Sequence, residues 1–123
     1  MPDHTAIPLA TAVARRDEPE LLLLLDPGIE FRGMTADRFT EARGPAEVLE
    51  VLLTDWLTPT DQVTGIKSVD TDTVADLHRV GYRLYLVNPG GSFVVEHLAY
   101  FRLRADRVAW LQMMSSGLLP RQT

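Results

Sequence analysis

Three apolar runs dominate the chain between Ala75 and Ser116, and their alternation of apolar and polar residues predicts three antiparallel strands. Two turn signals separate the runs, Pro89-Gly90-Gly91-Ser92 and Ala105-Asp106. The glycine pair supplies the positive φ values that a tight hairpin needs, so the first signal predicts a β-hairpin. The sheet formed by these strands has to be covered by the rest of the chain.

One face of this predicted sheet is apolar, and the other carries most of the charge. Because side chains alternate along a strand, counting outward from the glycine turn places Leu84 opposite His97. Pairing Arg104 with Arg107 carries the apolar face onto the last strand. The predicted apolar face then holds Val80, Tyr82, Leu84, Leu86, Val95, His97, Ala99, Phe101, Val108, Trp110, Gln112 and Met114.

The N-terminal half predicts helices and two further strands. Asp17 is suited to cap the second helix, with Pro19 in its first turn. The helix that starts at Gly44-Pro45 carries a broad apolar stripe. In chain order the predicted elements are helices Leu9–Arg16 and Glu18–Leu25, strand Ile29–Arg32, an irregular connection Gly33–Gly44, helix Pro45–Leu57, strand Thr60–Thr73 and a polar turn Asp70–Thr73.

Length and composition restrict the class of protein. The 123 residues predict one domain over 1–123, because this length supports a single core. A net charge of −5, with Lys67 as the only lysine, disfavours a nucleic-acid groove. The longest apolar run, Leu21–Leu25, is too short to cross a membrane, and no signal segment precedes it. The absence of cysteine fits a reducing compartment, so we expect a cytoplasmic protein.

Metal and cofactor sites are not predicted. The three histidines, His4, His78 and His97, lack the spacing of a zinc site. The hairpin explains Gly90 and Gly91, so these glycines do not predict a phosphate-binding loop. We therefore expect no metal and no cofactor.

Three segments carry a resemblance to a known superfamily. They are Ile29-Glu30-Phe31-Arg32-Gly33, the helix start Gly44-Pro45-Ala46-Glu47-Val48, and the strand-turn-strand segment from Tyr100 to Val108. With the order of the elements, they make the chain resemble the nuclear transport factor 2-like superfamily, in its SnoaL-like branch. The resemblance implies an α+β fold, a cystatin-like cone in which a curved, mainly antiparallel sheet wraps around the N-terminal and central helices. It also implies a small apolar ligand in the cone and, commonly, a dimer.

The family's chemistry transfers only in part. Where ketosteroid isomerase has its carboxylate base, this sequence has Phe31 and Arg32, and where it has its second acidic group, this sequence has Leu98. The resemblance therefore disfavours that isomerase reaction. SnoaL-like cyclases pair an acidic residue with a histidine, and the possible partners in this chain are His97 or His78 with Glu96 or Asp37.

His97 is the leading candidate for chemistry, because the register places its imidazole on the apolar face. We expect it either to act as a general base, with Tyr82 or Gln112 orienting a substrate oxygen, or to be a core histidine hydrogen-bonded to Tyr82. The side chains expected to line an apolar ligand pocket are Phe31, Trp56, Leu84, Phe101, Trp110 and Met114.

Three functions remain open from the sequence. The protein is an enzyme of the cyclase, isomerase or hydrolase type, a binding module for a small apolar molecule, or a protein-interaction module. A homodimer through the outer sheet face is expected, since monomers rarely expose a large apolar patch. The predicted patch is Tyr85, Leu98, Tyr100, Leu111 and Met113. A β-bulge would reverse the facing locally and turn Glu96 inward.

Overall fold

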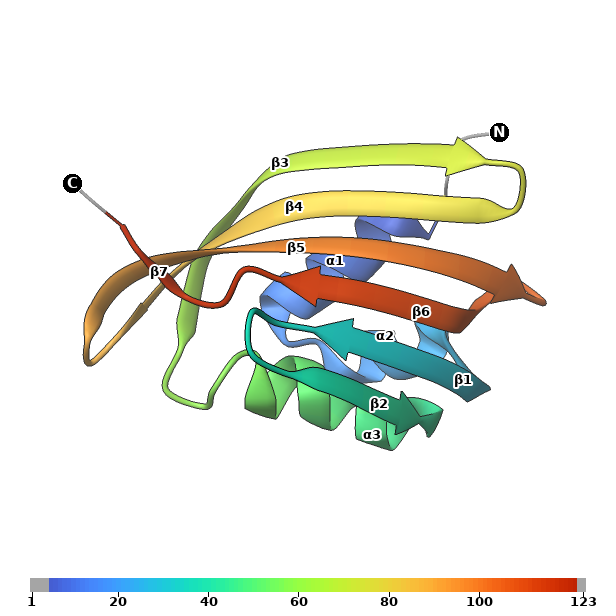
Figure 1. Ribbon diagram of the computed structural model, residues 1–123, viewed down its shortest axis with the longest axis horizontal. Coiled ribbons are helices and arrows are strands. Elements are labelled where there is room, and N and C mark those ends of the chain that lie inside the picture. The colour runs from blue at the N-terminus through green and yellow to red at the C-terminus, as the bar shows by residue number, and fades with distance from the viewer. Residues whose placement is uncertain (1–4, 122–123) are drawn as a thin grey trace.

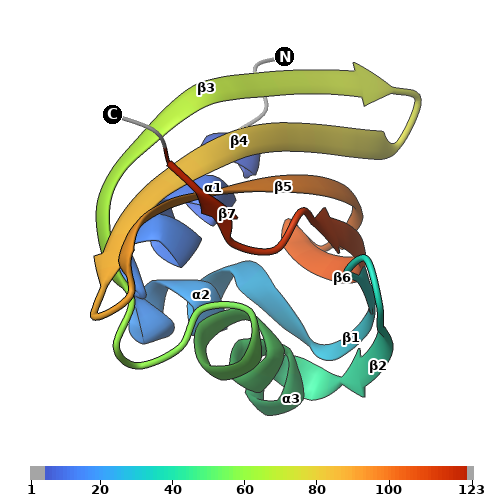
Figure 2. The same ribbon diagram turned by 60° about the vertical axis from the view of Figure 1, so that its left-hand side comes forward.

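A strongly curved sheet wraps around the helices in the computed structural model, which describes residues 5–121 (Figures 1 and 2). Seven strands form this sheet within the described range, in the order β2-β1-β6-β5-β4-β3, with β7 paired to β5. Only the β1–β6 pairing is parallel. The strands are β1 (Leu25–Met34), β2 (Phe39–Arg43), β3 (Gln62–Val74), β4 (Leu77–Asn88), β5 (Gly91–Arg104), β6 (Arg107–Ser115) and β7 (Leu119–Pro120).

The helices lie on the concave side of the sheet (Figure 2). They are α1 (Ala6–Arg15), α2 (Glu18–Leu24) and α3 (Gly44–Glu50), and α3 continues into a π-helical turn, η1 (Val51–Asp55). Helix α1 packs on β3 and β4, whereas α3 packs on β1. This arrangement is the α+β cone that the sequence predicts.

The start of α2 follows the predicted capping chemistry. The carboxylate of Asp17 accepts a hydrogen bond of 3.1 Å from the backbone N–H of Glu20, and Pro19 lies in the first turn. Of the leucines that follow Glu20, Leu21 and Leu25 are buried, whereas Leu22 and Leu23 are exposed. A helix on the rim of a cone buries one side only, so consecutive leucines cannot all point inward.

The β4–β5 hairpin has the predicted faces with a different pairing. Tyr82 pairs directly with His97, and Arg83 pairs with Glu96, so the prediction of Leu84 opposite His97 is two residues out of register. The two-residue turn is Pro89-Gly90, followed by Gly91 with a φ of 130°. An even shift leaves every side chain on its predicted face, because the side-chain period is two.

A β-bulge reverses the predicted facing of β6. Leu103 pairs with Val108 and Arg102 pairs with Trp110, which leaves Ala109 as the extra residue. Val108 and Ala109 are both buried as a result. Beyond the bulge the concave face holds Leu111, Met113 and Ser115, and the convex face holds Trp110, Gln112 and Met114.

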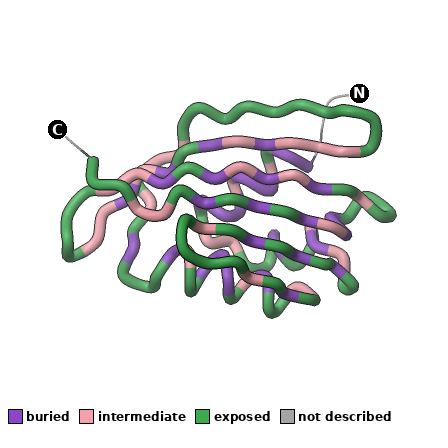
Figure 3. The backbone as a smooth tube through the Cα atoms, in the orientation of Figure 1, coloured by how far each residue is buried: buried purple, intermediate pink, exposed green. Residues whose placement is uncertain are grey.

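Two segments that were predicted as a connection and a turn form strands of the sheet. The connection expected over Gly33–Gly44 contains β2, whose only buried residue is Ala42. The turn expected at Asp70–Thr73 lies inside β3, and the chain reverses at Ala75-Asp76 instead. Both stretches are almost fully exposed (Figure 3), so they lack the apolar alternation from which strands are predicted.

Candidate functional site

The centre of the concave face holds one polar pair, Tyr82 on β4 and His97 on β5. Their exposed fractions are 2% and 1%, and the sheet register places them directly opposite each other. The Tyr82 hydroxyl lies 3.1 Å from Nδ1 of His97. The two rings meet edge to face, with 5.3 Å between centroids. The predicted contact between these two residues is therefore present.

Burial keeps both side chains uncharged near neutral pH. Desolvation lowers the pKa of His97 to about 4 and raises the pKa of the Tyr82 hydroxyl. The second ring nitrogen of His97, Nε2, is buried and has no hydrogen-bond partner among the described residues. Buried polar atoms are normally hydrogen-bonded, so this nitrogen marks a position where a partner is missing.

Trp56 covers the imidazole. It follows the π-helical turn η1, where its backbone N–H donates to the carbonyl of Val51 at 2.8 Å, a bond across five residues. The Trp56 ring centroid lies 5.5 Å from that of His97 and 6.0 Å from that of Phe31. The wider turn thus ends with an indole that packs between β1 and the polar pair.

Gly33 on β1 makes room for this indole. A Cβ atom at residue 33 would lie 2.7 Å from Cζ2 of Trp56 and 2.7 Å from Cε1 of Phe31, closer than carbon atoms pack. Any side chain at residue 33 would therefore have to displace one of the two rings. The position of Trp56 depends on the absence of a side chain there.

An open pocket of about 380 Å³ lies on the other side of Trp56. Trp56 lines this pocket and His97 does not, so the indole stands between the pocket and the polar pair. The β1–β2 turn, the end of η1 and the segment after β6 form its walls. Its lining residues are Thr35, Asp37, Arg38, Thr40, Asp55, Trp56, Thr58, Ser115, Gly117 and Leu118.

The predicted site residues divide between the two faces of the sheet. His97, Tyr82, Trp56 and Phe31 come together as described. Leu84 and Phe101 are also buried on the concave side, where Phe101 stacks on the ring of His78 at 5.1 Å.

Three of the predicted residues lie on the convex face, because of the bulge at Ala109. Gln112 and Met114 are exposed, and Trp110 packs against the guanidinium of Arg102 at 4.9 Å. The prediction that these three face the cone is wrong. For the same reason, Leu111 and Met113 do not belong to the outer patch, since both are buried.

Sequence reasoning missed Gly33 and the pocket walls. Gly33 continues the alternation of Ile29 and Phe31, so a longer first strand would have placed it inward. Ser115 pairs with His97 in the sheet and lines the pocket, yet it could not be placed there without the bulge. No residue pattern in the sequence predicts the π-helical turn.

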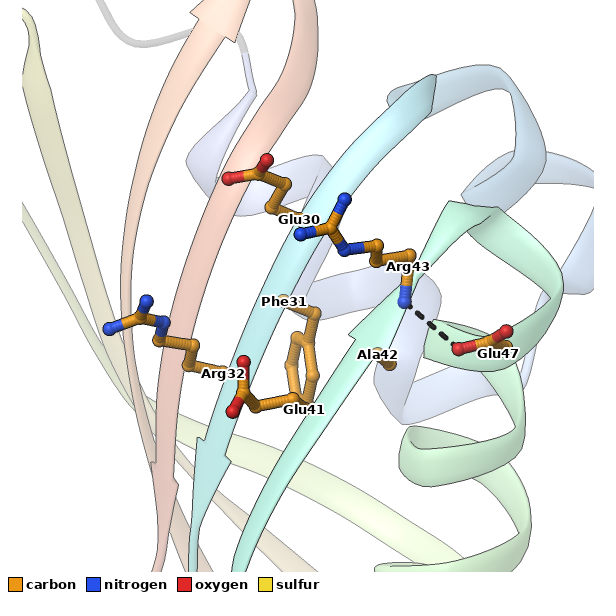
Figure 4. Close-up of a pocket in the computed structure, with 7 residues that line it drawn as sticks. All are labelled: Glu30, Phe31, Arg32, Glu41, Ala42, Arg43 and Glu47. Carbon is orange, nitrogen blue, oxygen red and sulfur yellow. Dashed lines mark hydrogen bonds between the residues drawn. The ribbon is translucent and has the colours of Figure 1, made fainter.

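A second, charged pocket of about 260 Å³ lies over β1 and β2 (Figure 4). Glu30 pairs with Arg43 and Arg32 pairs with Glu41, so four charges of alternating sign form a square. Among residues 5–121 none of these four forms an ion pair. Arg43 donates its backbone N–H to Oε1 of Glu47 at 3.0 Å. We name Glu30, Arg32, Glu41 and Arg43 the charge square.

The described residues contain no group of three His, Cys, Asp or Glu side chains arranged to hold a metal ion. His4 lies outside the described residues. No helix in the described part of the chain is long and apolar enough to cross a membrane.

Comparison with known proteins identifies similar structures. No protein-family model and no curated protein matches the sequence. Among solved structures, a candidate isomerase from Rhodopseudomonas palustris has a TM-score of 0.75 at 19% identity, covering 95% of this chain and 93% of that one. An NTF2-like protein of unknown function from Cytophaga hutchinsonii has 0.62 at 12%, covering 92% and 97%. An LEH-like epoxide hydrolase from M. tuberculosis has 0.66 at 9%, covering 91% and 82%.

Proposed function

The chain has the nuclear transport factor 2-like fold, and we propose that it binds a small, mainly apolar molecule inside the cone, in contact with His97. The observation that carries this proposal is the buried Nε2 of His97, which has no hydrogen-bond partner within residues 5–121 and belongs to a ring centred 5.5 Å from the Trp56 ring. A ligand that enters from the open pocket and displaces the indole would reach this nitrogen.

Energetics support a ligand at this position. A buried polar atom without a partner costs about 1–3 kcal/mol, which a purely structural core could avoid with an apolar side chain. The neighbouring side chains are apolar and suit an apolar molecule. In this proposal the ligand packs among Phe31, Trp56, Leu84 and Phe101, and its polar atom meets His97.

Chemical conversion is a second candidate, supported by the hydrogen bond between Tyr82 and His97. Such a pair can polarise a bound oxygen through a hydrogen bond. However, a pKa of about 4 makes the imidazole a weak base at neutral pH, so proton abstraction by His97 is the less favoured role. Binding is therefore the primary proposal, and a reaction of the cyclase, isomerase or hydrolase type is secondary.

We further propose a homodimer through the convex face of the sheet. Phe39, Met34, Met114 and Leu98 are neighbours across four strands and form an apolar row, in which the first three are about half exposed. The charge square lies beside this row. Opposite signs at adjacent corners are self-complementary, because a copy rotated by 180° about an axis in the sheet plane, parallel to β1 and β2, sets Glu30 over Arg43 and Arg32 over Glu41. A cytoplasmic location belongs to the same proposal.

A thermal-shift screen with small apolar molecules tests the ligand proposal. The proteins are wild type, the double variant Tyr82→Phe/His97→Phe, and Tyr85→Phe as a matched tyrosine control on the opposite face of β4, where its ring lies under Lys67 and Arg121. We expect ligands that raise the melting temperature of wild type and of Tyr85→Phe but not of the double variant. At a hundredfold excess over Kd, binding adds about 2.7 kcal/mol of stability. Equal stabilisation of all three proteins, or of none, would contradict the proposal.

A further inference from the structure

The hydrogen bond between Tyr82 and His97 assigns the proton on the imidazole. We propose that Nε2 of His97 carries that proton and donates a hydrogen bond to a neutral carbonyl oxygen. The bound molecule is then an apolar ketone or a close relative. This inference rests on the proposed binding function and names the chemical class of its ligand.

The assignment follows from counting unsatisfied groups in the two possible tautomers. If Tyr82 donates its O–H to Nδ1, the pair leaves one orphan, the N–H at Nε2. If Nδ1 donates to the Tyr82 oxygen instead, the Tyr82 O–H and the bare Nε2 both lack a partner, because the hydroxyl has no second hydrogen bond within residues 5–121. Each buried orphan is unfavourable, so the first tautomer is the stable one.

The surroundings of Nε2 select a neutral acceptor. Trp56 and Tyr82 contact the ring, and within residues 5–121 no charged side chain forms a hydrogen bond or an ion pair with it. A carboxylate ligand would lose its water without gaining a cation. An ammonium ligand would meet an N–H donor. A neutral oxygen satisfies the donor without either penalty.

Among neutral oxygens, a carbonyl fits better than a hydroxyl. A hydroxyl can accept from Nε2, but its own hydrogen then needs an acceptor. Nδ1 already accepts from Tyr82 in the assigned tautomer, and Phe31, Leu84 and Phe101 of the core are apolar. Ser115, which pairs with His97 in the sheet, already accepts from the Gly117 N–H at 3.1 Å. A ketone therefore leaves no orphan, whereas an alcohol replaces one orphan by another.

The tautomer is measurable in the protein alone. Long-range ¹H–¹⁵N spectra of histidine side chains distinguish a protonated nitrogen from a bare one, and the His97→Gln variant identifies the signals of residue 97. We expect a protonated Nε2 and a bare Nδ1 at pH 7. A protonated Nδ1 would overturn the inference.

The ligand class is tested with tetralin, 1-tetralone, 1-tetralol and 2-naphthoate, which share a bicyclic skeleton and differ in their polar group. We expect 1-tetralone to bind wild type at least tenfold more tightly than tetralin or 1-tetralol, and 2-naphthoate to bind most weakly. In Tyr82→Phe/His97→Phe the advantage of the ketone over tetralin should disappear, while circular dichroism verifies that this variant is folded.

The outcomes separate this inference from the proposed function. If tetralin or the alcohol binds as tightly as the ketone, or if the double variant keeps the preference, the inference is wrong and binding in the cone stands. If none of the four compounds binds wild type, the binding proposal itself fails for molecules of this size.

Discussion

The Tyr82 hydroxyl lies 3.1 Å from Nδ1 of His97, while Nε2 of the same ring has no hydrogen-bond partner among the described residues. The pair is thus half satisfied in the free protein. Half-satisfied polar pairs destabilise a core relative to apolar residues of the same shape. The pair therefore contributes little to stability, which supports the proposed ligand.

This relationship predicts non-additive stability changes. Tyr82→Phe leaves both imidazole nitrogens without partners, and His97→Phe leaves the Tyr82 hydroxyl without one, so each single variant should lose about 1–3 kcal/mol. The double variant removes every orphan and should be at least as stable as wild type. Urea unfolding followed by circular dichroism gives the comparison. A double variant less stable than both single variants would mean that the pair is structural.

The pKa of His97 predicts a loss of stability in mild acid. The folded state holds the imidazole neutral down to about pH 4, whereas the unfolded chain takes up a proton near pH 6.5. The unfolded state therefore binds more protons between these values, and stability falls as the pH drops from 6.5 to 4. The expected loss is roughly 1.4 kcal/mol per pH unit and about 3 kcal/mol in total. Unfolding curves of His97→Phe across the same range should lack this component; an identical slope would refute the assignment.

Gly33→Ala should displace Trp56. The added Cβ would lie 2.7 Å from the indole, so we expect the ring to move toward the pocket and toward solvent. In a Trp110→Phe background, Trp56 emission should shift to longer wavelength and acrylamide should quench it more strongly. Gly65→Ala is the matched control, since a Cβ there meets nothing within 4 Å. Unchanged emission in Gly33→Ala would show that Trp56 is not held by this contact.

If the charge square lies in the dimer interface, one charge reversal should weaken self-association and a second should restore it. Arg32→Glu sets like charges against each other across the proposed two-fold, and it should weaken the dimer at least tenfold. Adding Glu41→Arg reverses both corners and should restore association. Sedimentation equilibrium measures all three proteins, with melting temperatures as the control for folding. Wild type that sediments as a monomer of 13.7 kDa at tens of micromolar would contradict the dimer.

Outside the site, we expect substitution of Asp61 to cause the largest loss of folding stability. Its buried carboxylate accepts from the Asn88 amide at 2.9 Å and from the Thr58 N–H at 2.8 Å. Desolvation opposes ionisation, but these hydrogen bonds and Arg16 outweigh it and lower the pKa of Asp61. Asp61→Ala leaves these two donors without an acceptor and should lower the free energy of unfolding, measured in urea, by about 2–3 kcal/mol. Exposed Asp55→Ala should cost much less, and equal losses would argue against this account.

The sequence predicted those parts of the fold in which the residue pattern records burial. Strands β4 and β5 alternate because each has one face on the core, and the facing of Tyr82 and His97 followed from that. The edge strand β2 buries only Ala42, so its residues gave no alternating signal. Its existence depends on pairing with β1, which is a tertiary contact.

The candidate site was predicted where local rules suffice and missed where one residue changes the register. A single extra residue at Ala109 moves Gln112 and Met114 to the convex face. Neighbouring residues do not determine where such a bulge forms, because it depends on the curvature and twist of the whole sheet. Likewise, the π-helical turn that positions Trp56 contains a backbone hydrogen bond that spans five residues in place of four. The apolar stripe of α3 does not indicate where this turn forms.

The most direct test of binding behind Trp56 is a titration of wild type with 1-tetralone, observed by NMR at the histidine and tryptophan side chains. We expect the His97 Nε2–H and Trp56 indole signals to shift together and saturate at one Kd, while the Trp110 indole on the convex face stays unchanged. Saturable shifts at Trp110 without shifts at His97, or no saturable shift at either ring, would contradict binding behind Trp56.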